Sequence, residues 1–128
     1  MNLVADTHAV IWYLTEPTLL SKMAYQSLSQ ARFIYVSAIS VVEIRYLIEK
    51  GTVTEVAFQN IIDFLNDPNV TLTLVPLDLD IALALSQISR RVVPDMPDRI
   101  ITATALHLGL PLVTRDKQIQ AANIQTIW

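Results

Sequence analysis

The sequence predicts an α/β protein with three layers, α/β/α, built around a central parallel sheet of about five strands. The first observation is a set of five short runs rich in Val, Ile, Leu or aromatic residues and bounded by polar or turn residues. The second is apolar residues at three- and four-residue spacing between these runs, which is typical of helices. Strands that alternate with helices predict a parallel sheet covered on both faces by right-handed crossovers.

The expected strands are residues 2–5, 33–36, 72–75, 112–114 and 124–127. The expected helices are residues 7–14, 21–31, 39–50, 54–66, 78–90, 98–108 and 116–121. Gly51 and Gly109 stand where helices end. Pro97, just ahead of Asp98, is in the position that proline prefers in a first helical turn.

The composition limits the function classes. A chain of 128 residues predicts a single domain, residues 1–128, with a core of its own. Hydrophobic residues make up 52%, so we expect part of the apolar surface to face a partner. The absence of cysteine excludes disulfides and thiolate metal sites. A net charge of −3 argues against strong nonspecific binding of nucleic acid to a basic surface.

No apolar run approaches the roughly 18 to 20 residues of a membrane span. The longest, "FIYVSAISVV", contains two serines and is followed by Glu43. The start has no basic segment and no cleavage site of small residues. We therefore expect a cytoplasmic protein with no membrane partner.

Four acids stand at or near helix starts, where the predicted fold can bring them together. Asp6 follows the first strand in "LVADTHAV", Glu43 lies on the helix after the second strand, Asp98 begins the helix "DRIITATALHLG", and Asp116 follows the fourth strand in "LVTRD". Parallel strands end at the same edge, and ligands of such sheets bind outside it. We expect three of these acids at this edge and Asp98 on a helix that can approach it.

Each acid also has an ordinary structural role. Asp6 can cap a helix, and Asp98 and Asp116 can offset a helix dipole. Glu43, three residues after Ser40, can complete a capping box. Glu43 fits its ordinary role worst, because its helical face is otherwise apolar and a buried charge needs a partner or a metal.

The mutual repulsion of the four acids indicates how they could coexist in one site. Two like charges ~4 Å apart repel by about 4 kcal/mol at an effective dielectric constant near 20, so the four acids cannot all stay ionised unaided. Either some of them are protonated or a divalent cation neutralises them. The candidate ligands are oxygens, and His8 and His107 lack zinc-site spacing. This combination favours Mg²⁺ or Mn²⁺.

Three further features have more than one interpretation. His8 either touches a substrate or is an ordinary helical histidine. Asp95, in "PDMPDRI", either caps the helix or reaches the metal. Trp12, Tyr13 and Leu14 either belong to the core or anchor a partner.

The segments "LVADTHAVIWYL", "VSAISVVEIRYLIEKG" and "PDRIITATALHLGLPLVTRD" resemble the PIN-domain family, and within it the VapC-type ribonuclease toxins of bacterial toxin–antitoxin pairs. Asp6, Glu43, Asp98 and Asp116 match the four metal-site acids of that family in order. The resemblance implies a PIN-like fold and an endoribonuclease that acts on RNA, is typically a homodimer and is silenced by an antitoxin.

Such a site implies metal-assisted phosphodiester hydrolysis. We expect Asp6 and Asp98 to be direct ligands, with Glu43 and Asp116 completing the site or orienting water.

Two arginines stand next to candidate ligands. Arg99 and Arg115 are expected to bind the scissile phosphate or the neighbouring backbone, unless they are ordinary solvated side chains.

Two other functions remain open at this point. A phospho-receiver signalling domain is also a small α/β protein with acids and Mg²⁺, but it needs paired acids after its first strand, where this chain has only Asp6. Its phospho-accepting Asp ends the third strand, whereas here Asp78 comes only after Pro76 and Leu77. The other alternative is a noncatalytic binding module on the same fold.

Overall fold

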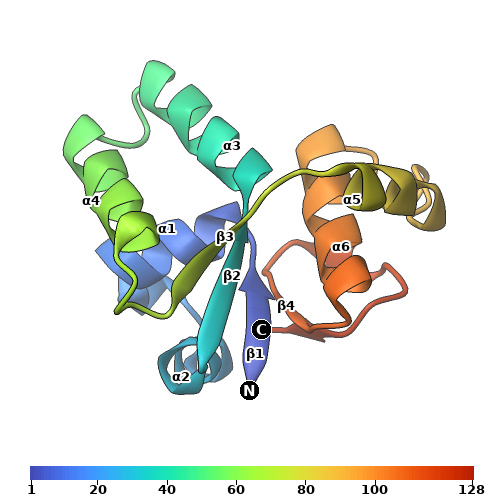
Figure 1. The fold of residues 1–128 in the computed structure, drawn as a ribbon, viewed down its shortest axis with the longest axis horizontal. Coiled ribbons are helices and arrows are strands. Elements are labelled where there is room, and N and C mark those ends of the chain that lie inside the picture. The colour runs from blue at the N-terminus through green and yellow to red at the C-terminus, as the bar shows by residue number, and fades with distance from the viewer.

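The five predicted strands form one parallel sheet. The computed structural model describes residues 1–128, and its strands lie in the order β3-β2-β1-β4-β5 (Figure 1). The strands are β1 (Asn2–Ala5), β2 (Phe33–Ser37), β3 (Leu72–Val75), β4 (Leu112–Val113) and β5 (Thr126–Ile127). Every neighbouring pair is parallel, with Leu3 beside Ile34 and Val4 beside Leu112. The predicted parallel sheet is confirmed.

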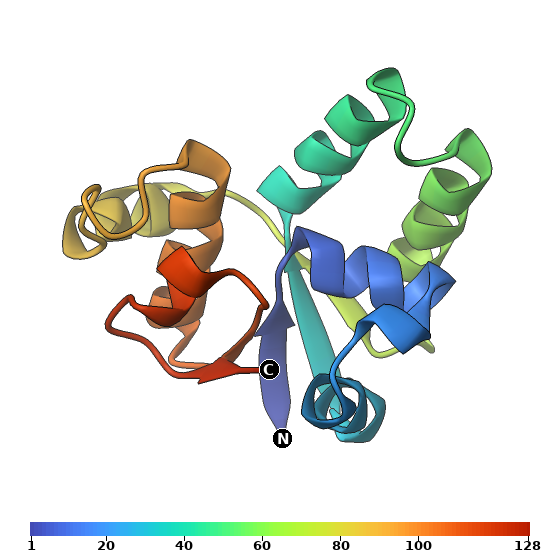
Figure 2. The same ribbon diagram turned by 180° about the vertical axis from the view of Figure 1, so that it is seen from behind.

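Helices cover both faces of the sheet, which gives the predicted three layers. Figures 1 and 2 show the first four helices on one side and the last three on the other. The first group is α1 (Thr7–Thr15), α2 (Lys22–Gln30), α3 (Ala38–Glu49) and α4 (Glu55–Asn66), with a short 3₁₀ turn, η1 (Pro17–Leu19). The second is α5 (Leu79–Ala84), α6 (Met96–Leu108) and α7 (Lys117–Gln120), with a second 3₁₀ turn, η2 (Leu85–Gln87). None of these helices has the length and apolar composition required to cross a bilayer.

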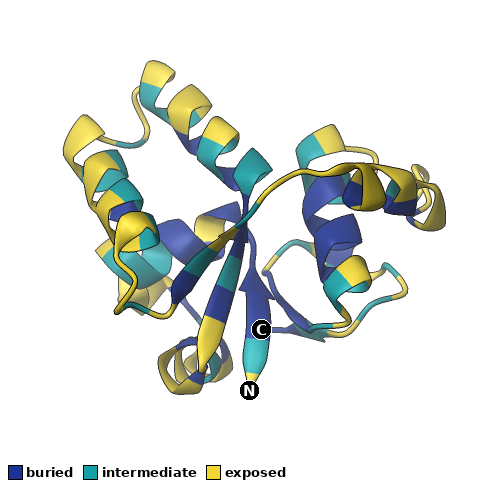
Figure 3. Cartoon of the chain, viewed as in Figure 1, coloured by how far each residue is buried: buried dark blue, intermediate teal, exposed yellow.

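The core follows from the two-residue period of the strands. In β1, Leu3 and Ala5 face the core beneath α1 to α4, whereas Val4 faces the core beneath α5 to α7. In Figure 3 the buried parts lie in the central strands and on the helix faces against them, whereas the start of β2 and part of β3 are exposed. The central strand is therefore apolar on both faces, as parallel sheets require.

One predicted helix is wrong. Residues 78–90 were expected to form a continuous helix, but α5 ends at Ala84 and is followed by η2. The Ile88 N–H donates to the Leu85 carbonyl at 3.0 Å, which closes a 3₁₀ turn. The carbonyls of Leu85 and Ile88 also accept hydrogen bonds from Arg99 Nη2, both at 2.9 Å, so a side chain from α6 binds the end of this segment.

Other boundaries differ by a few residues for local reasons. Helix α6 begins at Met96 rather than Asp98, because Asp95 caps it and accepts from the Asp98 N–H at 3.2 Å. Strand β5 begins later than predicted, because the Ile124 N–H donates to Ala122 within a turn. Strand β4 ends at Val113, and the Thr114 hydroxyl accepts from the Asp116 N–H at 3.0 Å.

The strand order decides between the fold alternatives. Strand β1 lies between β2 and β4, so the chain order reverses between β1 and β4. Receiver domains have the order 2-1-3-4-5, which this sheet does not have. The receiver alternative is therefore contradicted, and the reversal point is where a ligand site is expected.

Candidate active site

A cleft of about 450 Å³ opens at the carboxyl edge of the sheet. Residues from α1, α3, α6 and the β4–α7 connection line it, so it lies at the reversal point between β1 and β4. The lining residues are Asp6, Thr7, His8, Trp12, Glu43, Asp95, Asp98, Arg115 and Asp116. The structure brings all four acids singled out in the sequence into one cleft and adds Asp95 to them.

Asp6 lies at the bottom of the cleft, directly after β1. Its side chain is only 9% exposed, and Oδ1 accepts from the Ala9 N–H at 2.9 Å, which caps α1. Burial raises the pKa of the Asp6 carboxyl, while the Thr114 hydroxyl and the Ala9 N–H oppose that rise. A buried acid of this kind needs a positive partner to stay ionised.

Glu43 reaches the cleft from α3 and is held there by the Thr7 hydroxyl, which also contacts Ser40. The Thr7 hydroxyl donates to Glu43 Oε1 at 2.5 Å, and Ser40 Oγ lies 3.0 Å from Thr7 Oγ1. Burial raises the pKa of Glu43, the bond from Thr7 lowers it, and the charge of Asp95 raises it further. The hydrogen bond from Thr7 thus fixes the orientation of the Glu43 carboxylate, and no salt bridge neutralises its charge.

The capping box considered for Glu43 does not form. Ser37 caps α3, with its Oγ accepting from the Ile39 N–H at 3.2 Å, and Ser40 lies inside the helix. The Glu43 carboxylate binds Thr7 instead, because the side chain points from α3 towards the start of α1.

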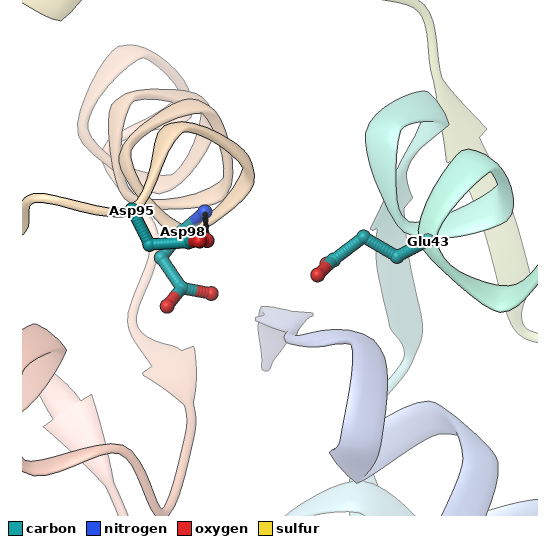
Figure 4. Close-up of side chains that lie close together, drawn as sticks. All are labelled: Glu43, Asp95 and Asp98. Carbon is teal, nitrogen blue, oxygen red and sulfur yellow. Dashed lines mark hydrogen bonds between the residues drawn. The ribbon is translucent and has the colours of Figure 1, made fainter. Parts of the chain in front are cut away.

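Asp95 and Asp98 project from the first turn of α6 towards Glu43 (Figure 4). These three residues offer carboxylate oxygens that all lie within 4.8 Å of one another. Burial, together with the charges of Asp95, Asp116 and Glu43, raises the pKa of Asp98 to about 7. A cluster made only of carboxylate oxygens fits Mg²⁺ or Mn²⁺, which prefer hard oxygen ligands.

Asp116 completes the acidic part of the cleft. Its Oδ1 caps α7 by accepting from the N–H groups of Gln118, at 2.8 Å, and Ile119, at 3.0 Å. Asp6 and Asp95 cap α1 and α6 in the same way. Cap and cleft are compatible, because helices that follow parallel strands begin at the carboxyl edge of the sheet.

The two arginines are placed differently. Arg115 is exposed and lines the cleft, with its Cζ 4.8 Å from the centre of the Trp12 ring. Arg99 does not line the cleft; its Nη2 binds the carbonyls of Leu85 and Ile88, and its buried Nε has no hydrogen-bond partner. The expectation that Arg99 faces a phosphate does not fit this geometry.

Three other residues line the cleft: Thr7, which was not singled out from the sequence, and His8 and Trp12, for which two interpretations were open. Thr7 was missed, although a hydroxyl next to Asp6 is a signal for a side chain that positions a carboxylate. His8 is exposed at the cleft, whereas His107 lies in the last turn of α6 away from it. Trp12 packs partly against the core and also lines the cleft.

Known proteins share this architecture. The PIN domain family model matches residues 3–124. The chain is 28% identical over 120 residues to "Ribonuclease VapC22" of Mycobacterium tuberculosis, which covers 94% of this chain and 91% of that protein. Among solved structures it is similar to a chain of VapBC2 from Rickettsia felis bound to a promoter DNA fragment, with a TM-score of 0.71, 15% identity and coverage of 98% and 97%. It is also similar to a chain of a toxin–antitoxin complex from Klebsiella pneumoniae, with a TM-score of 0.69, 21% identity and coverage of 98% and 96%.

Proposed function

Because the chain belongs to the PIN domain family, we propose that it is a Mg²⁺- or Mn²⁺-dependent endoribonuclease, the toxin component of a toxin–antitoxin pair. The observation that carries the proposal is the cleft in which Asp6, Glu43, Asp98 and Asp116 meet. The name of the mycobacterial relative, a ribonuclease, supports the choice of RNA as substrate.

The donor set of the cleft suits one or two hard divalent ions. We assign Asp6 and Asp98 as direct ligands, with Glu43 and Asp116 completing the site and Asp95 adding a carboxylate beside Glu43 and Asp98. A divalent ion bound there would supply an acidified water and charge stabilisation for an in-line attack on a phosphodiester.

The protein's own side chains prepare this chemistry. Asp98, with a pKa raised to about 7, holds a proton near neutral pH and gives it up when positive charge arrives. Thr7 fixes the Glu43 carboxylate. Arg115 is the only arginine or lysine among the lining residues, and its N–H groups serve to bind a phosphate oxygen.

We also propose a cognate antitoxin and a homodimer as partners. The names of the structural neighbours describe toxin–antitoxin complexes. Apolar side chains available to a partner are exposed on α3 (Val42 and Tyr46, 61% each) and on α5 (Leu79, 72%; Leu83, 64%). Tyr13 and Leu14, for which both a core position and a role as partner anchors were open, are partly buried and pack against the core. Light scattering on the purified chain should give twice the monomer mass, and a monomer mass over a wide concentration range would contradict the homodimer.

Cleavage of single-stranded RNA tests the proposed activity. The wild type should cut with Mg²⁺ or Mn²⁺ and stop cutting when EDTA is added. Asp6→Asn and Asp98→Asn should each lower the rate by at least about 100-fold, because each removes a metal ligand. Asp80→Asn is the matched control, since Asp80 lies in the first turn of α5 and does not line the cleft.

The outcomes separate the alternatives. Equal residual cleavage by the wild type and both cleft variants would indicate a contaminating nuclease. RNA binding without cleavage in either metal would favour the noncatalytic binding module.

A further inference from the structure

The cleft has two walls of different chemistry. One is acidic and carries Asp6, Glu43, Asp95, Asp98 and Asp116. The other, here called the aromatic wall, is formed by His8, Trp12 and Arg115, and Trp12 is the only hydrophobic residue that lines the cleft. Metal chemistry accounts for the acidic wall, and the proposed phosphate contact of Arg115 leaves the His8 and Trp12 rings without a role.

The aromatic wall is built from side chains that pack on one another. His8 and Trp12 lie one turn apart on α1, with ring centres 5.4 Å apart and planes tilted by 47°. Arg115 Cζ lies 4.8 Å from the centre of the Trp12 ring. Trp128 supports Trp12 with a ring centre at 6.1 Å. The indole is therefore held in place at the cleft rather than free to turn.

Arg115 is not there to neutralise the acids. It is the sequence neighbour of Asp116, yet the structure contains one salt bridge, Arg45 with Glu55, and Arg115 is not part of it. An arginine that served as a counter-ion would pair with a carboxylate. Arg115 instead lies over an aromatic ring and is exposed, which leaves its outer surface and its N–H groups available to a ligand.

Aromatic rings and guanidinium groups are the surfaces on which unpaired nucleobases stack. We propose that the aromatic wall binds a nucleobase of the nucleotide next to the scissile phosphate, so that the substrate is RNA with an unpaired base at that position. The proposal rests on the ribonuclease function proposed above. A base inside a duplex is already stacked on its neighbours, so the aromatic wall favours single-stranded segments.

Tryptophan fluorescence tests the contact directly. The Trp128→Phe variant retains Trp12 as its only tryptophan, and Trp12→Phe retains only Trp128. A single-stranded RNA decamer is added in Ca²⁺, with a gel to verify that it stays intact and anisotropy of a labelled decamer to measure binding. Quenching in Trp128→Phe but not in Trp12→Phe is expected. Binding by anisotropy with no change in Trp12 emission would overturn the proposal.

A comparison of substrates tests the role in catalysis. After the cut bond has been mapped, the base on either side is removed in turn to give an abasic RNA of equal charge. The wild type should lose about ten-fold in kcat/KM on one of the two abasic substrates. Trp12→Leu should be about ten-fold slower than the wild type on the intact RNA. Its kcat/KM should not fall further on the abasic RNA. Trp12→Phe, which keeps an aromatic ring, should restore most of the difference.

Two further variants control for folding. Tyr13→Leu removes an aromatic side chain from the same helix, but Tyr13 packs on Tyr25 and does not line the cleft, so it should discriminate like the wild type. Arg115→Ala changes an exposed side chain and should lose discrimination without loss of thermal stability. If the wild type cuts RNA but treats intact and abasic substrates alike, the aromatic wall has no such role. If it cuts no RNA, the ribonuclease proposal itself fails, and this one with it.

Discussion

Thr7 connects α1 to α3 through one hydroxyl, which contacts both Glu43 and Ser40. Thr7→Val keeps the shape and removes the donor, so Glu43 loses its orientation. We expect RNA cleavage to fall by about 10- to 100-fold and the affinity for Mn²⁺ to fall with it, the usual effect of removing a group that orients a metal ligand. Cleavage rates and a Mn²⁺ titration measure both effects.

Thr7→Ser is the matched control, because it keeps the hydroxyl. Activity restored in the serine variant would identify the hydrogen bond as the cause. Equal loss in the Val and Ser variants would show that the hydroxyl alone does not restore activity, and would contradict the hydrogen bond as the cause.

Alanine variants of the two arginines near the acids should have different effects, one on stability and the other on RNA binding. Arg99→Ala removes the donor to the Leu85 and Ile88 carbonyls, so it should lower the free energy of unfolding by about 2 kcal/mol. Arg115→Ala should leave unfolding unchanged and raise KM for RNA. Urea denaturation and steady-state kinetics measure the two quantities. If Arg99→Ala raised the KM for RNA and left the free energy of unfolding unchanged, Arg99 would bind the substrate and its proposed structural role would be wrong.

Asp98 gives the metal-free protein a pH dependence with a defined sign. Its pKa is about 7 in the folded chain against an ordinary 3.8. As pH rises above about 4, the unfolded chain loses the proton first, so folding is progressively disfavoured until the folded carboxyl also ionises near pH 7. Asp98→Asn, compared with the wild type in EDTA, should therefore gain relative stability between pH 4 and pH 8. A difference independent of pH would contradict the raised pKa.

At the scale of elements, local signals predicted most boundaries. The apolar runs and their flanking residues located all five strands, and six of the seven helices lie within two residues of their predicted ends. The exception, residues 78–90, ends in a 3₁₀ turn in which the Leu85 carbonyl also binds Arg99, 14 positions away in the sequence. No local pattern contains that interaction, so periodicity alone could not predict the break.

Variants of Asp95, the cap of α6, can separate its effect on stability from its effect on metal binding. Asp95 accepts from the Asp98 N–H and also faces Glu43. Asp95→Asn keeps an acceptor and removes a charge, so it should preserve stability and weaken Mn²⁺ binding. Asp95→Ala should in addition lose about 1 kcal/mol of unfolding free energy, as caps do. Chemical denaturation and metal titration of both variants measure the two effects; equal metal affinity in Asn and wild type would exclude Asp95 from the metal site.

At the scale of the whole molecule, the sequence predicted where the acids meet but not how. Strand–helix alternation implies a common carboxyl edge, and this places Asp6 and Asp116 together. The approach of α3 to α6, which brings Glu43 near Asp95 and Asp98, is a tertiary contact that no spacing in the chain encodes. The aromatic wall was missed for the same reason, because Trp12 and Arg115 are far apart in sequence.

Metal binding should stabilise the entire fold, since the acids join α1, α3, α6 and the β4–α7 connection. At pH 8, Mg²⁺ or Mn²⁺ at about 100 times its Kd should add about 2.7 kcal/mol to the free energy of unfolding. Thermal melts with and without the ion measure this, with NaCl at equal ionic strength as control. A shift of equal size in Asp6→Asn would show that the ion binds elsewhere.

The double use of acids as helix caps has a consequence for catalysis and folding. An aspartate exchanged for asparagine keeps a capping oxygen but surrenders its negative charge, and at Asp6 or Asp116 the helix would still start where it does now. Such an exchange would therefore remove a proposed metal ligand while the helix start and the fold are preserved, so catalysis and folding can be lost independently at these two positions.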